Sequence, residues 1–126
     1  MKNLERTVYP SGDRTILIDG TEDEYGGAHL YHASHCLGFK DGKTVYDFEH
    51  QTTIQFVRKI SDTEVIGGLQ SEQLVLILLD RHEKLNAKYP SLQYDKMKRG
   101  LEMFLEACKE RVNERLSRGV MGELKK

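Results

Sequence analysis

The feature that most constrains the fold is a change in residue periodicity at Gly67-Gly68. Before this pair, β-branched and aromatic runs alternate with turn residues, as in strands. After it, apolar residues recur every three or four positions, as on one face of a helix. A length of 126 residues fits one domain. We therefore expect a single α+β domain over residues 1–126, with a strand-rich part at 1–68 and a helical hairpin at 69–126.

The first part predicts a small antiparallel β-sheet of three to five strands. Strands are expected at residues 15–18, 52–57 and 64–66, and residues 22–27 are expected to form an acidic loop. Asp41-Gly42 separates two further strand-like runs, and an Asp-Gly pair in that place favours a tight hairpin turn.

The second part predicts an antiparallel two-helix hairpin. Ser71 is the expected N-cap of the first helix, which should end near Lys88 because Pro90 disfavours helical geometry at the residue before it. Ser91 is the expected cap of the second helix, and Gly119 its stop. The apolar stripe of this second helix comprises Met97, Leu101, Phe104, Leu105, Cys108, Val112 and Leu116.

Residues 74–79 of the first helix are apolar without interruption. A helix that is apolar on every side is buried on every side, and a small domain builds only a limited core. This favours a homodimer or higher homo-oligomer. The alternative is that the sheet and the second helix cover the run completely.

Charge and hydropathy exclude several classes of function. The net charge is -1, so no general basic field for DNA is expected. No run approaches the roughly 18 apolar residues of a membrane span, and no signal-peptide pattern is present. We expect a protein that acts inside a cell without DNA or membrane as partner.

The residue types of a metal site occur in the first part without a suitable spacing. His29, His32 and His35 lie beside Cys36. In a strand, alternate side chains point to opposite faces, so His32 would point away from the other two histidines. A structural or surface role is therefore expected, with no metal and no cofactor.

No residue set predicts catalysis. Neither Cys36 nor Cys108 occurs in a nucleophile motif, and Cys108 is expected in the core. Asp80 and Glu83 near His82 are typical of a solvated helix face. We therefore expect a protein that is not an enzyme.

The arginines of the second helix are the most informative polar residues. Arg111, Arg115 and Arg118 are spaced by four and three positions, which places them on one helix face. The planar guanidinium group suits bidentate binding of phosphate. The alternative is a solvated face with ion pairs, in which Glu114 reaches Arg111 and Arg118.

The tip of the expected hairpin and the glycine pair are weaker candidates. Tyr89 and Tyr94 offer rings that can stack on a base, and Asn86 offers an amide that can bind a base edge. The alternative is that these residues only close the turn. Gly67-Gly68 precedes a helix N-terminus, which can receive an anion, but a simple turn is favoured there.

Residues 69–122 resemble a helical-hairpin domain of phage anti-defence proteins. The resemblance is to the Thoeris anti-defence sponges of the first described type, and anti-CBASS cyclic-nucleotide sponges share the hairpin. The strand-rich part at 1–68 also fits the Thoeris type. The matching stretches are Lys84-Leu85-Asn86, Tyr89-Pro90-Ser91, Leu101-Glu102, Glu110-Arg111, Arg115 and Arg118-Gly119-Val120.

The resemblance implies a viral protein in the cytoplasm of an infected bacterium. Such sponges bind cyclic ADP-ribose isomers made by TIR-domain enzymes, hold them without cleavage, and so block Thoeris immunity. They form dimers that assemble further, often to hexamers, and some also bind cyclic di- or trinucleotides. The alternatives are a sponge for CBASS cyclic oligonucleotides, with or without the first activity, and a protein–protein inhibitor of a host defence enzyme.

The resemblance carries over to part of the predicted ligand-binding set. Arg111, Arg115 and Arg118 match the family's arginine-rich pattern, and Asn86 and Tyr89 match its turn. Leu92-Gln93-Tyr94 stands where the family often has a polar Arg-Glu-Asn-like stretch. The prediction of Tyr94 as a ligand-binding residue therefore depends only on its residue type and its position at the tip.

Overall fold

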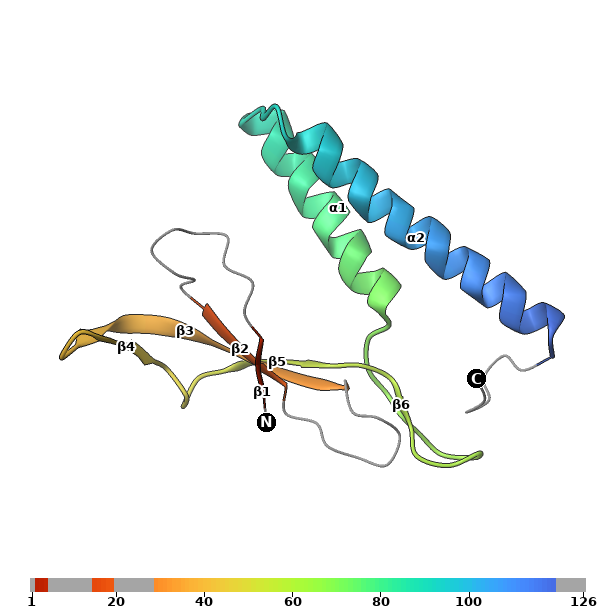
Figure 1. The fold of residues 1–126 in the computed structure, drawn as a ribbon, viewed down its shortest axis with the longest axis horizontal. Helices are drawn as coiled ribbons and strands as arrows, with labels where there is room; N and C mark the ends of the chain where they lie inside the picture. The colour runs from red at the N-terminus through yellow and green to blue at the C-terminus, as the bar shows by residue number, and fades with distance from the viewer. Residues whose placement is uncertain (1, 5–14, 20–28, 120–126) are drawn as a thin grey trace. The chain divides into compact units, whose positions relative to one another are not determined.

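A computed structural model describes residues 2–4, 15–19 and 29–119, with side chains for 29–119 (Figure 1). The chain forms two compact units, Met1–Gly68 and Leu69–Lys126. The first unit holds strands and the second two helices, so the α+β class predicted from the sequence is confirmed. The acidic loop expected at residues 22–27 lies outside the described residues.

A long central strand organises the first unit. Strand β3 (Leu30–Lys40) pairs with β2 (Thr15–Asp19), β4 (Lys43–Tyr46) and β5 (Thr52–Gln55), all antiparallel. Strand β1 (Lys2–Leu4) pairs with β2 and completes a five-stranded sheet within the described part of the chain. The polar residues around β1 gave no strand signal, so the sequence did not predict it. A separate small sheet joins β6 (Arg58–Lys59) to β7 (Val65–Ile66).

The turn between β3 and β4 confirms the hairpin predicted from Asp41-Gly42. Both residues have positive φ, 52° for Asp41 and 76° for Gly42. A two-residue turn of this kind matches the right-handed twist of the strands that it joins, and aspartate and glycine adopt it most readily. The register shifts between Cys36 and Gly38, so β3 carries a bulge before the turn.

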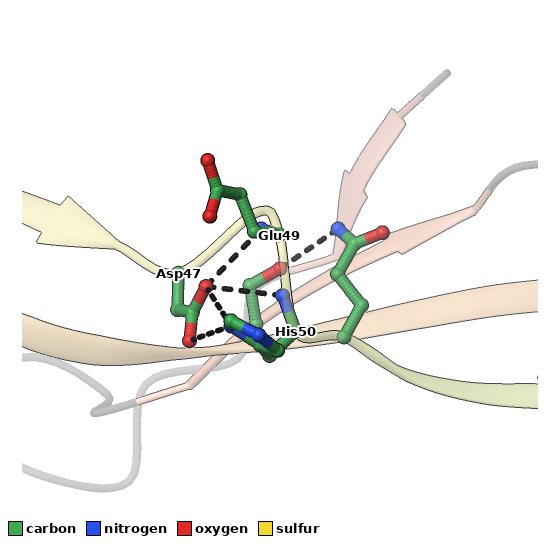
Figure 2. A network of polar contacts seen from close by, with 5 residues as sticks. Asp47, Glu49 and His50 are labelled. Atoms are coloured by element: carbon green, nitrogen blue, oxygen red, sulfur yellow. Dashed lines mark hydrogen bonds and ion pairs between the residues drawn. The ribbon is translucent and has the colours of Figure 1, made fainter.

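The segment after β4 is fixed by hydrogen bonds around Asp47 (Figure 2). Asp47 Oδ1 accepts from the backbone N–H groups of Glu49 (3.1 Å) and His50 (3.0 Å), and His50 Nδ1 lies 3.2 Å from Asp47 Oδ2. Burial would raise the pKa of Asp47, but these hydrogen bonds and the nearby imidazole outweigh it and hold the pKa below its ordinary value. The Asp47 carboxylate therefore stabilises the turn that follows β4.

The next residue after this turn is bonded to a buried hydroxyl of β3. Gln51 Nε2 donates to Ser34 Oγ at 2.8 Å, and Ser34 is fully buried. A hydroxyl without solvent access cannot attack a dissolved substrate. Ser34 is therefore a structural residue, although a serine, a histidine and an aspartate occur close together in this part of the fold.

The second unit is the predicted helical hairpin, α1 (Ser71–Lys88) and α2 (Tyr94–Ser117). The N-cap of α1 is Gln70, so the prediction of Ser71 was wrong. The Gln70 backbone N–H donates to Gln73 Oε1 at 3.0 Å, and the Gln73 backbone N–H donates to Gln70 O at 3.0 Å. The Gln73 side chain thus supplies one half of a capping box, while Gln70 contributes only backbone groups to these two bonds. Ser71 is the first helical residue.

The prediction of Ser91 as the cap of α2 was also wrong. The helix begins at Tyr94 with Gln93 as its N-cap. Ser91 Oγ instead accepts from the Gln93 backbone N–H (3.1 Å) and donates to Gln93 Oε1 (2.9 Å), so it builds the turn before the helix. The predicted stop is confirmed, because Gly119 has a φ of 70° and its N–H donates to Leu116 O.

The hairpin leaves much of its apolar surface accessible. Val75 is 8% exposed, whereas Leu76 and Ile77 on the same helix are 54% and 55% exposed. Helix α2 has no buried residue, and Phe104 and Leu116 of its predicted stripe are exposed. Neither described helix is long and apolar enough to span a membrane.

Gly68 is required by a close backbone approach within the first unit. A Cβ at this position would lie 2.5 Å from Gln55 O and 2.7 Å from the carbonyl carbon of Phe56. At Gly67 an added Cβ meets nothing within 4 Å. The pair predicted as a simple turn therefore contains one residue that cannot carry a side chain without displacing backbone.

We expect Gly68→Ala to lower the free energy of unfolding by about 1–3 kcal/mol, because overpacking against backbone forces local displacement. Thermal or urea unfolding followed by circular dichroism measures the change. Gly67→Ala is the matched control and should unfold close to wild type. Equal stability of the two variants would contradict the close approach.

Candidate functional site

Two of the predicted arginines line a hollow within the helical hairpin, which we call the arginine hollow. Its volume is about 340 Å³. Helix α1 contributes its first two residues and α2 contributes residues of its C-terminal half. The lining residues are Ser71, Glu72, Phe104, Cys108, Arg111, Val112 and Arg115.

Helical geometry explains why these residues share one hollow. Each of residues 104, 108, 111, 112 and 115 lies three or four positions from another of the set, so they follow one face of α2. The chain reverses between α1 and α2, so the start of α1 lies beside the C-terminal half of α2 (Figure 1). Residues of the predicted apolar stripe therefore line the hollow together with Arg111 and Arg115.

The arginine hollow contains a carboxylate as well as guanidinium groups. Glu72 and Arg111 both lie close enough to the Cys108 thiol to act on it electrostatically, and all three side chains line the hollow. Burial raises the pKa of Cys108 above its ordinary value, the Glu72 charge raises it further, and Arg111 opposes them. Cys108 is half-buried and not bonded to Cys36, so it stays a thiol.

The third predicted arginine lies outside the lining of this hollow. Arg118 caps the C-terminus of α2 and forms an ion pair with Glu114 one turn earlier. The ion-pair alternative raised for the arginine face thus applies to Arg118. Of the three predicted arginines, Arg111 and Arg115 line the hollow and Arg118 does not.

The predicted tip residues lie at the opposite end of the hairpin. Asn86 Oδ1 accepts from the Ser91 backbone N–H at 2.9 Å, so this amide oxygen closes the turn. Tyr89 is 67% exposed, with Lys88 Nζ 5.7 Å from its ring centre, and Tyr94 is the half-buried first residue of α2.

Asn86 lies 14 residues after Glu72 on α1, and Tyr94 lies 17 residues before Arg111 on α2. At 1.5 Å per residue these separations are about 21 and 26 Å along the helix axes, more than a single small nucleotide spans. One hairpin therefore cannot apply both sets of predicted residues to the same ligand.

A second hollow of about 320 Å³ lies between the helices, nearer the tip. It was not predicted from the sequence. Gly100 could have indicated it, because a glycine inside a helix lowers helix stability by about 1 kcal/mol relative to alanine. Here the missing side chain leaves space beside α1. The lining residues are Leu78, His82, Lys96, Met97, Gly100 and Leu101.

The histidine, cysteine and acidic residues considered for metal binding or catalysis include several that make local contacts. His32 Nδ1 lies 3.0 Å from Thr53 Oγ1, and Lys84 Nζ lies 2.9 Å from Asp80 Oδ2. Cys36 Sγ donates to Gly38 O at 3.5 Å. Within residues 29–119, the histidine, cysteine and acidic side chains form no group of three or more that could hold a metal ion.

No protein-family model matches this chain, and no curated protein matches it. Of the seven lining residues, only Arg111 and Arg115 were predicted as site residues, and Glu72 is the charged residue that sequence reasoning missed.

We expect Glu72→Gln to speed alkylation of Cys108 by iodoacetamide several-fold at neutral pH. Removing the carboxylate charge lowers the thiol pKa towards its ordinary value, so the reactive thiolate becomes more abundant. Peptide mass spectrometry measures the rate, and Cys36 in the first unit serves as the internal reference. An unchanged ratio of the two rates would contradict the contact between Glu72 and Cys108.

Proposed function

We propose that this protein is a phage anti-defence sponge that sequesters TIR-made cyclic ADP-ribose isomers without degrading them. It would thereby block Thoeris immunity in the cytoplasm of an infected bacterium. The observation that carries the proposal is the arginine hollow, in which Arg111 and Arg115 line one recess. The resemblance of residues 69–122 to the Thoeris sponges supports the same reading.

The chemistry of the hollow suits a pyrophosphate. Two guanidinium groups one helical turn apart can each donate paired hydrogen bonds to phosphate oxygens. Burial of a dianion without such partners costs several kcal/mol, so the arginines are what make binding favourable. A volume of about 340 Å³ lies at the lower end of the range typical of small-molecule sites.

Phe104 and Val112 supply the apolar part of the same lining. An adenine base needs such a surface, because its rings lose water contacts on binding. A recess with guanidinium groups beside apolar side chains therefore offers the two environments that a cyclic ADP-ribose requires.

We also propose that the working form is a homo-oligomer. The exposed apolar residues Leu76 and Ile77 favour burial against another copy. The distance between the arginine hollow and the tip of the hairpin also favours a homo-oligomer. If Asn86, Tyr89 and Tyr94 contact the ligand that Arg111 and Arg115 hold, they must come from a different copy.

The first experiment is incubation of the purified protein with the product of an activated TIR enzyme, followed by washing, heat release and mass spectrometry. We expect recovery of an intact cyclic ADP-ribose isomer. A linear or cleaved product would overturn the sponge proposal in favour of an enzyme. Recovery only of added cyclic di- or trinucleotides would favour the CBASS type, and no retained nucleotide would favour a protein–protein inhibitor.

Two arginine variants locate the site. Arg111→Ala and Arg115→Ala should each weaken binding of the TIR product by about tenfold or more, because each removes a charge-assisted hydrogen bond to phosphate. Isothermal titration calorimetry measures the dissociation constant. Arg99→Ala is the matched control, since Arg99 is exposed on the same helix and its Nε donates to Asp95 O. Wild-type affinity in both hollow variants would remove the phosphate role.

Ile77→Asp should reduce the oligomer to a smaller species, because it places a charge in the apolar surface that we assign to self-association. Sedimentation velocity measures the mass in solution. Arg81→Asp introduces the same side chain at an exposed polar position of α1 and should keep the wild-type mass. Ile77→Asp at the wild-type mass, or a monomeric wild type, would contradict the assembly proposal.

A further inference from the structure

The carboxylate of Glu72 is out of place in a hollow that binds only phosphate. It shares the lining with Arg111 and Arg115. A negative group near bound phosphate repels it, so Glu72 opposes the attraction that the arginines supply. A site that selected phosphate alone would do better with a neutral side chain at this position.

We propose that Glu72 is a specificity-determining residue that accepts hydrogen bonds from ribose hydroxyls of the bound ligand. This inference rests on the proposed function, because it assumes that Arg111 and Arg115 hold the phosphates. The ligand class is then a ribonucleotide in which a sugar hydroxyl lies next to the phosphate groups.

The position of Glu72 fits this role. It is the second residue of α1 and faces the arginines of α2 across one recess. The Cys108 thiol lies beside its carboxylate in the same lining. An ionised carboxylate offers about four acceptor positions, so one thiol contact leaves others for a ligand.

The same division of labour occurs in other nucleotide sites. In dinucleotide-binding folds the phosphates lie at a helix N-terminus, and an acidic side chain accepts from the ribose hydroxyl. Here the arginines would take the phosphates and Glu72 the sugar. A hydroxyl bonded to a carboxylate is a charge-assisted pair and contributes more than a neutral hydrogen bond.

The rival explanation is that Glu72 serves only as a counter-ion for the arginines and as a first-turn acid that stabilises α1. In that case Glu72 would not distinguish between nucleotides of equal charge. A comparison between two such nucleotides therefore separates the two explanations.

The test uses ADP and 2′,3′-dideoxy-ADP as probes, which carry the same phosphates and differ only in the sugar hydroxyls. Isothermal titration calorimetry on the full chain gives both dissociation constants. Wild type should prefer ADP by about tenfold or more, the effect of hydrogen bonds to a charged group. Glu72→Gln should bring the preference down several-fold, because it loses the charge and one acceptor.

The matched control is Glu106→Gln, at an exposed position of α2 outside the hollow, and it should keep the wild-type preference. Circular dichroism checks that both variants are folded. The same preference in Glu72→Gln as in wild type, or no preference in wild type, would overturn the inference.

Failure of this inference can be told apart from failure of the proposed function. If wild type binds neither probe but retains the TIR product, the sponge proposal stands and the ribose role of Glu72 is overturned. If wild type binds neither the probes nor the TIR product, both fall.

Discussion

The antiparallel pairing of α1 with α2 is the constraint on which the candidate site depends. Residues 104, 108, 111, 112 and 115 lie on one face of α2, but the face of a single helix does not form a recess. The recess arises because the chain reverses after Tyr89 and brings Ser71 and Glu72 next to the far half of α2. A register shift of one turn between the helices would replace Glu72 by a different neighbour and change the charge of the hollow.

The parts of the fold that follow from local backbone chemistry could be predicted from the sequence. Asp41-Gly42 made the hairpin turn because these residue types tolerate positive φ. Pro90 ended α1, and Gly119 ended α2, for equally local reasons. The two helix N-caps were wrong because capping depends on which side chain reaches which backbone group. At α1 the Gln73 side chain accepts from the Gln70 backbone N–H, and at α2 Ser91 is bonded within the preceding turn.

The site could be predicted only in part, since spacing within one helix shows which residues share a face and not what faces them. Arg111 and Arg115 were placed correctly on one face by their separation of four positions. Arg118, which is paired with Glu114, is not in the lining of the hollow. The position of Glu72 beside these arginines depends on the alignment of two helices, which no pattern within either helix contains. The residues of β1 carried no signal because a three-residue polar strand exists only through its pairing with β2.

The charge balance of the arginine hollow links the proposed mode of action to the fold. With Arg111, Arg115 and Glu72 the lining carries a formal charge of about +1, so attraction to phosphate alone is moderate and salt-sensitive. A sponge gains nothing from turnover and must hold its ligand tightly, with about -12 kcal/mol needed for nanomolar affinity. Free phosphate and ordinary polyphosphates compete for any site that relies on charge. A carboxylate beside the arginines weakens these competitors and can favour a ligand that brings a hydroxyl to meet it. The residue that weakens anion binding is thus the one that would make the binding selective.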